Sequence, residues 1–163
     1  MNYLNIWRRQ GILLAAALLF SCAGFAQRVT LRALSIRSTD GTPVLSMAEN
    51  GSVTLNGEPG GVLGKDGVLQ SPEGELMSKL EKNGRLLDAE GNELIRLLPD
   101  GSMDAGEGRL LKWNSKGIIS AGEGMALRLL PNDQQLYKTA ALLIAFYFGI
   151  PEPDESADER NEE

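Results

Sequence analysis

The sequence predicts a mostly β protein built from tandem β-hairpin repeats of about 17 residues. Three observations support this: glycines recur at steps of 16 or 17 residues, turn-forming residues precede them, and apolar residues keep the same phase. A fixed period of this kind is typical of repeat architectures, in which short units share one core. The first glycine series is Gly51, Gly67, Gly84, Gly101 and Gly117, and the second is Gly41, Gly57, Gly74, Gly91, Gly108 and Gly124.

The residues before the glycines predict the turns. Most first-series glycines follow Asn or Asp, a pairing that favours tight two-residue hairpin turns because both central residues can adopt positive φ. Most second-series glycines follow Glu, which predicts loops one or two residues longer with Gly in the left-handed conformation. The dipeptides of the first series are Asn50-Gly51, Asp66-Gly67, Asn83-Gly84, Asp100-Gly101 and Lys116-Gly117.

Apolar residues form two columns in phase with the glycines. Stacked units would join each column into a continuous apolar stripe, which gives the repeats a shared core. The first column lies two positions after each first-series glycine and contains Val53, Leu69, Leu86, Met103 and Ile119. The second lies three positions after most second-series glycines and contains Val44, Met77, Leu94, Leu111 and Leu127.

Two architectures fit these units, an antiparallel meander of hairpins and a β-solenoid with one unit per coil. The Asn-Gly and Asp-Gly turns favour hairpins, whereas the near-constant unit length favours stacking. Helices are disfavoured because the runs between glycines are only about six residues long. We therefore expect successive hairpins.

The turn Pro99-Asp100-Gly101-Ser102-Met103-Asp104-Ala105-Gly106 resembles choline-binding-type cell-wall repeats. The resemblance implies stacked hairpins of similar size. Those families use several aromatic residues in each unit to cage a ligand, whereas Trp113 is the one aromatic residue of positions 27–131. The resemblance therefore implies the hairpin geometry and not the ligand site.

A helix is predicted after the repeats, over positions 134–148. Asn132 or Asp133 would cap its N-terminus, and Gly149 and Pro151 would end it. Its apolar run, positions 139–150, is shorter than the roughly 20 residues that span a bilayer. We expect this helix to cap or fill the core, and a membrane-associated or partner-binding helix is the alternative.

The N-terminus has the three parts of a secretory signal peptide over positions 1–26. Arg8 and Arg9 precede the apolar stretch 12–20, and small residues follow it. Cleavage after Ala26 is the favoured outcome. In the alternative, Leu19-Phe20-Ser21-Cys22 resembles a bacterial lipobox, which implies that Cys22 is lipidated as in a lipoprotein. The third outcome is an uncleaved anchor.

The C-terminus predicts a disordered acidic tail over positions 151–163, where seven acidic residues accompany Arg160. The predicted organisation is therefore a signal peptide at 1–26, a hairpin-repeat domain at 27–131, an apolar helix at 132–150 and this tail. Positions 27–150 hold 13 basic and 15 acidic residues, so no basic surface is expected that would attract nucleic acid.

The composition limits the chemistry. The chain has no histidine, and Cys22 is its one cysteine, which argues against disulfides, His-dependent nucleophiles and His/Cys zinc sites. Asp100, Asp104 and Glu107 are the best candidates for a cation site, but the spacing of known calcium loops is absent. We predict that these are solvated turn residues, and that the protein has no catalytic, metal or cofactor site.

These observations predict a non-catalytic exported cell-envelope protein that acts by binding or as a structural β-repeat. It would be periplasmic or at the cell surface, as an outer-membrane lipoprotein if Cys22 is lipidated. Its partner would be an envelope protein or a glycan, and it would meet a membrane only through its signal, a lipid anchor or the C-terminal helix. One alternative is a cell-wall or polysaccharide-binding module, and the other is a small carboxylate-dependent hydrolase.

Overall fold

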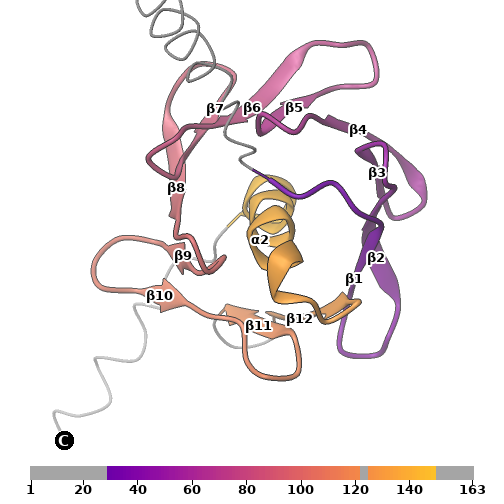
Figure 1. Ribbon diagram of the computed structural model, residues 1–163, viewed down its shortest axis with the longest axis vertical. Helices are drawn as coiled ribbons and strands as arrows, with labels where there is room; N and C mark the ends of the chain where they lie inside the picture. The colour runs from indigo at the N-terminus through magenta and orange to yellow at the C-terminus, as the bar shows by residue number, and fades with distance from the viewer. Residues whose placement is uncertain (1–28, 122–124, 150–163) are drawn as a thin grey trace, which may run out of the picture.

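Residues 29–121 and 125–149 are described by the computed structural model. Twelve short strands in these ranges form one antiparallel sheet that curls around a helix into a nearly closed barrel (Figure 1). The prediction of a mostly β protein is confirmed. The strands are β1 (Leu34–Arg37), β2 (Pro43–Met47), β3 (Ser52–Leu55), β4 (Glu58–Leu63), β5 (Val68–Gln70), β6 (Leu76–Leu80), β7 (Arg85–Asp88), β8 (Glu93–Leu97), β9 (Met103–Asp104), β10 (Leu110–Leu111), β11 (Ile118–Ala121) and β12 (Met125–Leu130).

The sheet is a meander that closes on itself through one long-range pairing. From β1 to β10 each strand pairs with the next, and β12 joins β1 on one side and β11 on the other. All eleven pairings between described strands are antiparallel, so the solenoid alternative with parallel stacking is wrong. The chain reverses direction at each turn, and a parallel neighbour would have needed a long crossover instead.

The first-series turns differ from the prediction, because they are three-residue loops. Ala48 and Ser52 flank one of them: the Ala48 amide donates to the Ser52 carbonyl at 2.9 Å, and Gly51 N–H donates to the Ala48 carbonyl at 2.9 Å. Asn50 does not adopt positive φ but accepts a hydrogen bond from the Ser52 amide through its side chain at 3.0 Å. Asp66, Asn83 and Asp100 accept in the same way in the corresponding turns.

The first apolar column is buried as predicted, with Val53, Leu69, Leu86, Met103 and Ile119 each at most 3% exposed. The second column is mostly wrong: Leu127 is buried as predicted, but Leu94 is 43% exposed and Val44, Met77 and Leu111 are only half-buried.

Bulges explain the failure of the second column. In the β7–β8 pair, Leu87 lies opposite Glu93 while Leu86 lies opposite Ile95, so Leu94 is an extra residue without an opposite partner. Val44 and Met77 are the extra residues at the same place in their hairpins. Because a bulge shifts the alternation by one position, Ile95 faces the core where Leu94 was expected to do so.

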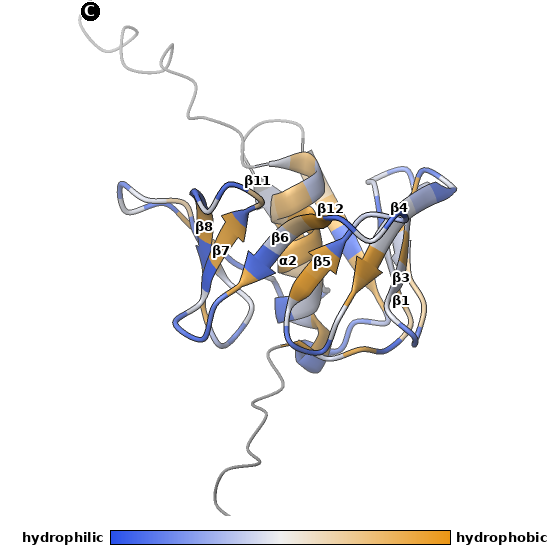
Figure 2. Ribbon diagram, turned by 90° about the horizontal axis from the view of Figure 1, so that it is seen from above, coloured by the Kyte–Doolittle hydropathy of each residue, from blue (hydrophilic) through white to orange (hydrophobic). Residues whose placement is uncertain are grey.

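Helix α2 (Gln134–Phe148) lies inside the barrel, with the strands around it (Figures 1 and 2). The predicted helix is therefore confirmed, and Asp133 is its N-cap, accepting from the Gln135 amide at 2.9 Å. Of the two predicted places, a cap or the core, the helix occupies the core. No helix in the described ranges is long and apolar enough to cross a membrane. Its buried residues are Leu136, Tyr137, Thr139, Ala140, Ala141, Leu142, Leu143, Ile144 and Ala145.

Polar contacts hold α2 at a fixed height in the barrel. Thr139 Oγ1 both accepts from the Thr30 amide and donates to the Thr30 carbonyl, each at 3.0 Å. In the last turn of the helix, Tyr147 donates its hydroxyl hydrogen to the carbonyl of Gly60 at 2.8 Å. Gly60 is the extra residue of the β3–β4 bulge, so the bulge supplies the acceptor.

Tyr147→Phe is expected to lower the free energy of unfolding by about 1 kcal/mol at neutral pH, the usual net value of one hydrogen bond. Burial raises the pKa of Tyr147 above its ordinary value, so the wild type should also lose stability as the pH rises beyond about 10. The Phe variant lacks the ionisable hydroxyl and should lose less stability over that pH range. Urea denaturation at pH 7 and above pH 10 measures both effects, and parallel curves for the two proteins would contradict the assigned role.

Candidate functional site

The hydrogen-bonded ladder of the sheet is interrupted between β10 and β11, at a hairpin that differs from the others. In four hairpins the carbonyl of a first-series glycine accepts from the backbone amide of a leucine on the return strand, for example Gly84 from Leu97 at 2.7 Å. In the hairpin that begins at Gly101, the same carbonyl accepts from the indole Nε1 of Trp113 at 3.0 Å. The side chain takes the place of the backbone donor, and β10 is only two residues long.

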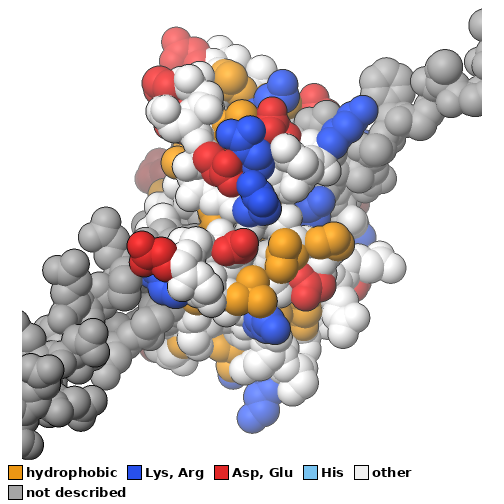
Figure 3. All heavy atoms as spheres, turned by 90° about the vertical axis from the view of Figure 1, so that its left-hand side faces the viewer, with side chains coloured by type: hydrophobic (Ala, Val, Ile, Leu, Met, Phe, Trp, Pro, Cys, Tyr) orange, Lys and Arg blue, Asp and Glu red, His pale blue; other side chains and the backbone are white. Residues whose placement is uncertain are grey.

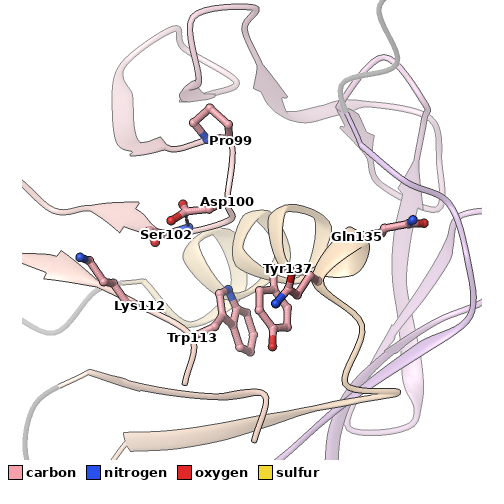
Figure 4. A pocket seen from close by; sticks show the side chains of 8 residues that line it. Pro99, Asp100, Ser102, Lys112, Trp113, Gln135 and Tyr137 are labelled. Carbon is pink, nitrogen blue, oxygen red and sulfur yellow. Dashed lines mark hydrogen bonds between the residues drawn. The ribbon is translucent and has the colours of Figure 1, made fainter. Parts of the chain in front are cut away.

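Trp113 connects this interruption to the central helix. Its ring stacks on Tyr137 of α2 with 4.9 Å between ring centroids and 17° between planes (Figure 4). Tyr137 donates its hydroxyl hydrogen to Asn132 Oδ1 at 2.7 Å, and Asn132 Nδ2 donates to the Ser115 carbonyl at 3.0 Å. The segment between β10 and β11 is thereby fixed to the start of the helix, so the aromatic pair is held in one geometry.

A groove of about 470 Å³ lies at this interruption, beside the N-terminal end of α2 (Figure 4). It combines an aromatic wall with an acid, a base and two amide side chains. Binding sites for small polar ligands have this composition, with a few polar groups placed around apolar or aromatic surface. The lining residues are Pro99, Asp100, Ser102, Lys112, Trp113, Gln134, Gln135 and Tyr137.

Asp100 is the fixed negative charge of the groove. The hydrogen bond from the Ser102 amide, 2.9 Å long, holds the pKa of Asp100 below its ordinary value, and the positive charge of Lys112 lowers it further. Asp100 is therefore ionised at neutral pH and acts as an acceptor, while Lys112 supplies donors and the Gln134 amide supplies both. The Gln135 side chain points away from Asp100 and Lys112 (Figure 4). The groove can bind a ligand rich in hydroxyl groups through all three kinds of side chain.

The structure separates the three residues that the sequence suggested as a cation site. Asp100 lines the groove, whereas Asp104 accepts from the Gly106 amide at 3.0 Å in its own loop and Glu107 is exposed at positive φ. Over the ranges 29–121 and 125–149, no group of three acidic, histidine or cysteine residues is placed to hold a metal ion. Cys22, the candidate for lipidation, lies outside the described residues, as do the predicted signal peptide and the predicted acidic tail.

The outer surface of the barrel next to the groove is mixed in character. The side formed by β7 to β10 shows apolar side chains among acidic and basic ones (Figure 3). Leu94 and Leu110 are exposed, and Arg85 forms a 2.6 Å ion pair with Glu93. This face has no single sign of charge and no large apolar area, so the groove is the better candidate site.

Comparison with known proteins gives no match to a protein family, to a curated protein or to a solved structure. The function is therefore inferred from the groove itself. Sequence reasoning named Asp100 and Trp113 but missed Lys112, Tyr137 and the two glutamines. Trp113 was the available signal, because it is the one aromatic residue of the hairpin region.

Proposed function

We propose that the protein is a non-catalytic exported protein of the cell envelope that binds a glycan in the groove beside Trp113. The observation that carries the proposal is the stacked Trp113–Tyr137 pair at the interrupted ladder, with charged and amide side chains around it. In this proposal the tandem hairpin units are the scaffold, and the one hairpin that departs from the pattern provides the site.

The sequence supports the export and the non-catalytic role. Positions 1–26 have the order of a secretory signal peptide, which favours a periplasmic or cell-surface location. A chain without histidine, and with no cysteine after Cys22, has few of the residues that usually act as nucleophile or general base. A carboxylate-dependent hydrolase is the weaker alternative, since Asp100 is the one carboxylate that lines the groove and glycoside hydrolysis normally uses two.

The chemistry of the groove favours a glycan over an apolar or a highly charged ligand. Pyranose rings present C–H faces that pack on aromatic side chains, and their hydroxyls both donate and accept hydrogen bonds. Asp100 can accept from such hydroxyls, Lys112 can donate to them, and the Gln134 amide, which also lines the groove, can do both. The single acid and single base among the lining residues leave the groove nearly neutral, which suits an uncharged stretch of polysaccharide.

Retention of the full chain on isolated peptidoglycan and on soluble envelope polysaccharides tests the proposal. Lys112→Ala is expected to weaken retention roughly tenfold, the usual effect of losing one hydrogen bond from a charged donor. Lys112 and Lys82 are both exposed, so Lys82→Ala, in a turn that does not line the groove, is the matched control and should bind as the wild type does. Retention no greater than that of an unrelated acidic protein would overturn the proposal, and release of new reducing ends would point to the hydrolase instead.

A further inference from the structure

Two arginines lie directly opposite each other on the outer face of the barrel. Arg37 on β1 pairs with Arg128 on β12, and Ile118 on β11 lies on the other side of Arg128 in the same row. These side chains point away from the core, because the adjacent residues Ile36 and Leu129 are fully buried. Like charges directly opposite each other in a sheet repel, so the arrangement costs stability unless something negative lies between them.

Neither arginine has a carboxylate partner among the described residues. The ion pairs there involve Arg32, Arg85 and Arg96, and none involves Arg37 or Arg128. Arg37 donates from Nη1 to the Gly41 carbonyl at 3.2 Å, but its Nε is buried without a hydrogen-bond acceptor in the described structure. A buried charged donor without an acceptor is costly, and such groups recur where a ligand supplies the acceptor.

The nearest turn carboxylate is already engaged in its own loop. Asp40 accepts from the Ser38 hydroxyl and from the Thr42 amide, the latter at 2.8 Å. The Ser38 hydrogen bond is the main reason that the pKa of Asp40 lies below its ordinary value. Asp40 does not line the space between the two arginines.

The arginines share a pocket of about 220 Å³ on this face. Beside Arg37 and Arg128 it is lined by polar residues of the β1–β2 turn, among them Thr39, and by the apolar Ile118 and Leu130. The pocket is thus positive at one part of its wall and apolar at another, and none of the described residues that line it is acidic.

We propose that this pocket binds the phosphate group of a phosphate monoester. Two guanidinium groups match the charge and the several acceptor oxygens of a phosphate dianion, and Arg forks bind such oxygens in bidentate fashion. The phosphate would lie between Arg37 and Arg128 and accept from their guanidinium groups. The organic part of the ester would pack on Ile118 and Leu130, for which the volume beyond the phosphate leaves room. The ester is either a soluble phosphorylated molecule or the headgroup of phosphatidic acid.

Titration of the full chain with inorganic phosphate and with phenyl phosphate, by calorimetry, tests the pocket. Phenyl phosphate is expected to bind more tightly than inorganic phosphate, because its ring can contact the apolar wall. Arg128→Gln should weaken binding of phenyl phosphate by roughly 10-fold or more, as expected for the loss of a charge-assisted hydrogen bond. Arg96→Gln, which also removes an exposed arginine from a strand but lies on β8, is the matched control and should bind as the wild type does.

Vesicles distinguish the two sources of the ester. Wild-type binding to phosphatidylcholine vesicles containing phosphatidic acid, absent without phosphatidic acid and lost in Arg128→Gln, would assign the lipid headgroup. Binding of phenyl phosphate without vesicle binding would assign a soluble ester, and both results support the pocket. The proposal is overturned if the wild type binds none of these probes, or if Arg128→Gln, folded by circular dichroism, binds them as the wild type does. Lys112→Ala should leave phosphate binding unchanged, so the result does not depend on the glycan proposal.

Discussion

Leu86→Asp is expected to lower the free energy of unfolding by roughly 4 kcal/mol or more, a large part of the stability of a small domain. Leu86 is fully buried on β7, lies opposite Ile95 and belongs to the inward-facing column that surrounds α2. The substitution removes a well-packed side chain and places a carboxylate among the apolar side chains of the core. Chemical denaturation followed by circular dichroism measures the loss, and the variant should be largely unfolded if the wild type is only marginally stable.

Leu94→Asp is the matched control, because it makes the same change in the same hairpin. Leu94 is the bulge residue and is 43% exposed, so its substitution should alter stability by less than about 1 kcal/mol. Lys82→Glu, at an exposed turn, should stay within about 0.5 kcal/mol. Equal losses from Leu86→Asp and Leu94→Asp would contradict both the inward column and the position of the bulge.

Gly101→Ala is expected to cost about 3–5 kcal/mol, from two effects that add. Gly101 has a φ of +81°, and a Cβ placed on it would lie 2.6 Å from the backbone carbon and the Cβ of Tyr137. Neither of these two atoms can move freely, because Tyr137 is inside the barrel and stacked on Trp113. The same change should shift the fluorescence of Trp113, whose indole donates to the Gly101 carbonyl.

Gly91→Ala separates the two effects. Gly91 has a φ of +89°, but a Cβ there would meet nothing within 4 Å. Its substitution should therefore cost only the strain of a left-handed residue, about 1–2 kcal/mol. A loss as large as that of Gly101→Ala would show that the packing of the turn against α2 contributes nothing.

The elements that local sequence decides were predictable, and those that depend on distant partners were not. The positions of the turns, the inward-facing apolar column and helix α2 follow from local pattern, and all three were predicted. The loop type was not, because Asn50-Gly51 and Asn56-Gly57 are the same dipeptide in different loops. Asn56 adopts positive φ, whereas Asn50 serves as a side-chain acceptor, and the register of the flanking strands decides between them.

Local reasoning left the place of α2 open between a cap and the core. The sequence showed an apolar run, and buried residues from Leu136 to Ala145 cover all sides of the helix, as expected for a helix surrounded by protein. Only the pairing of β1 with β12 turns the meander into an enclosure, and these strands are far apart in the chain. The groove depends on the same closure, which explains why Trp113 could be noticed in the sequence but Tyr137 could not be placed beside it.

The order in which the chain is made has a consequence for its assembly. Strand β1 can pair with β12 only after eleven further strands have been synthesised. Helix α2, which fills the interior, is synthesised after all twelve described strands. Until then the apolar sides of the earlier hairpins remain uncovered. The β1–β12 pairing and the contacts with α2 join residues far apart in the chain, and contacts of this kind make folding slow. If the chain is exported, as we propose, this timing is favourable, because a polypeptide that has not finished folding stays competent for passage through a membrane.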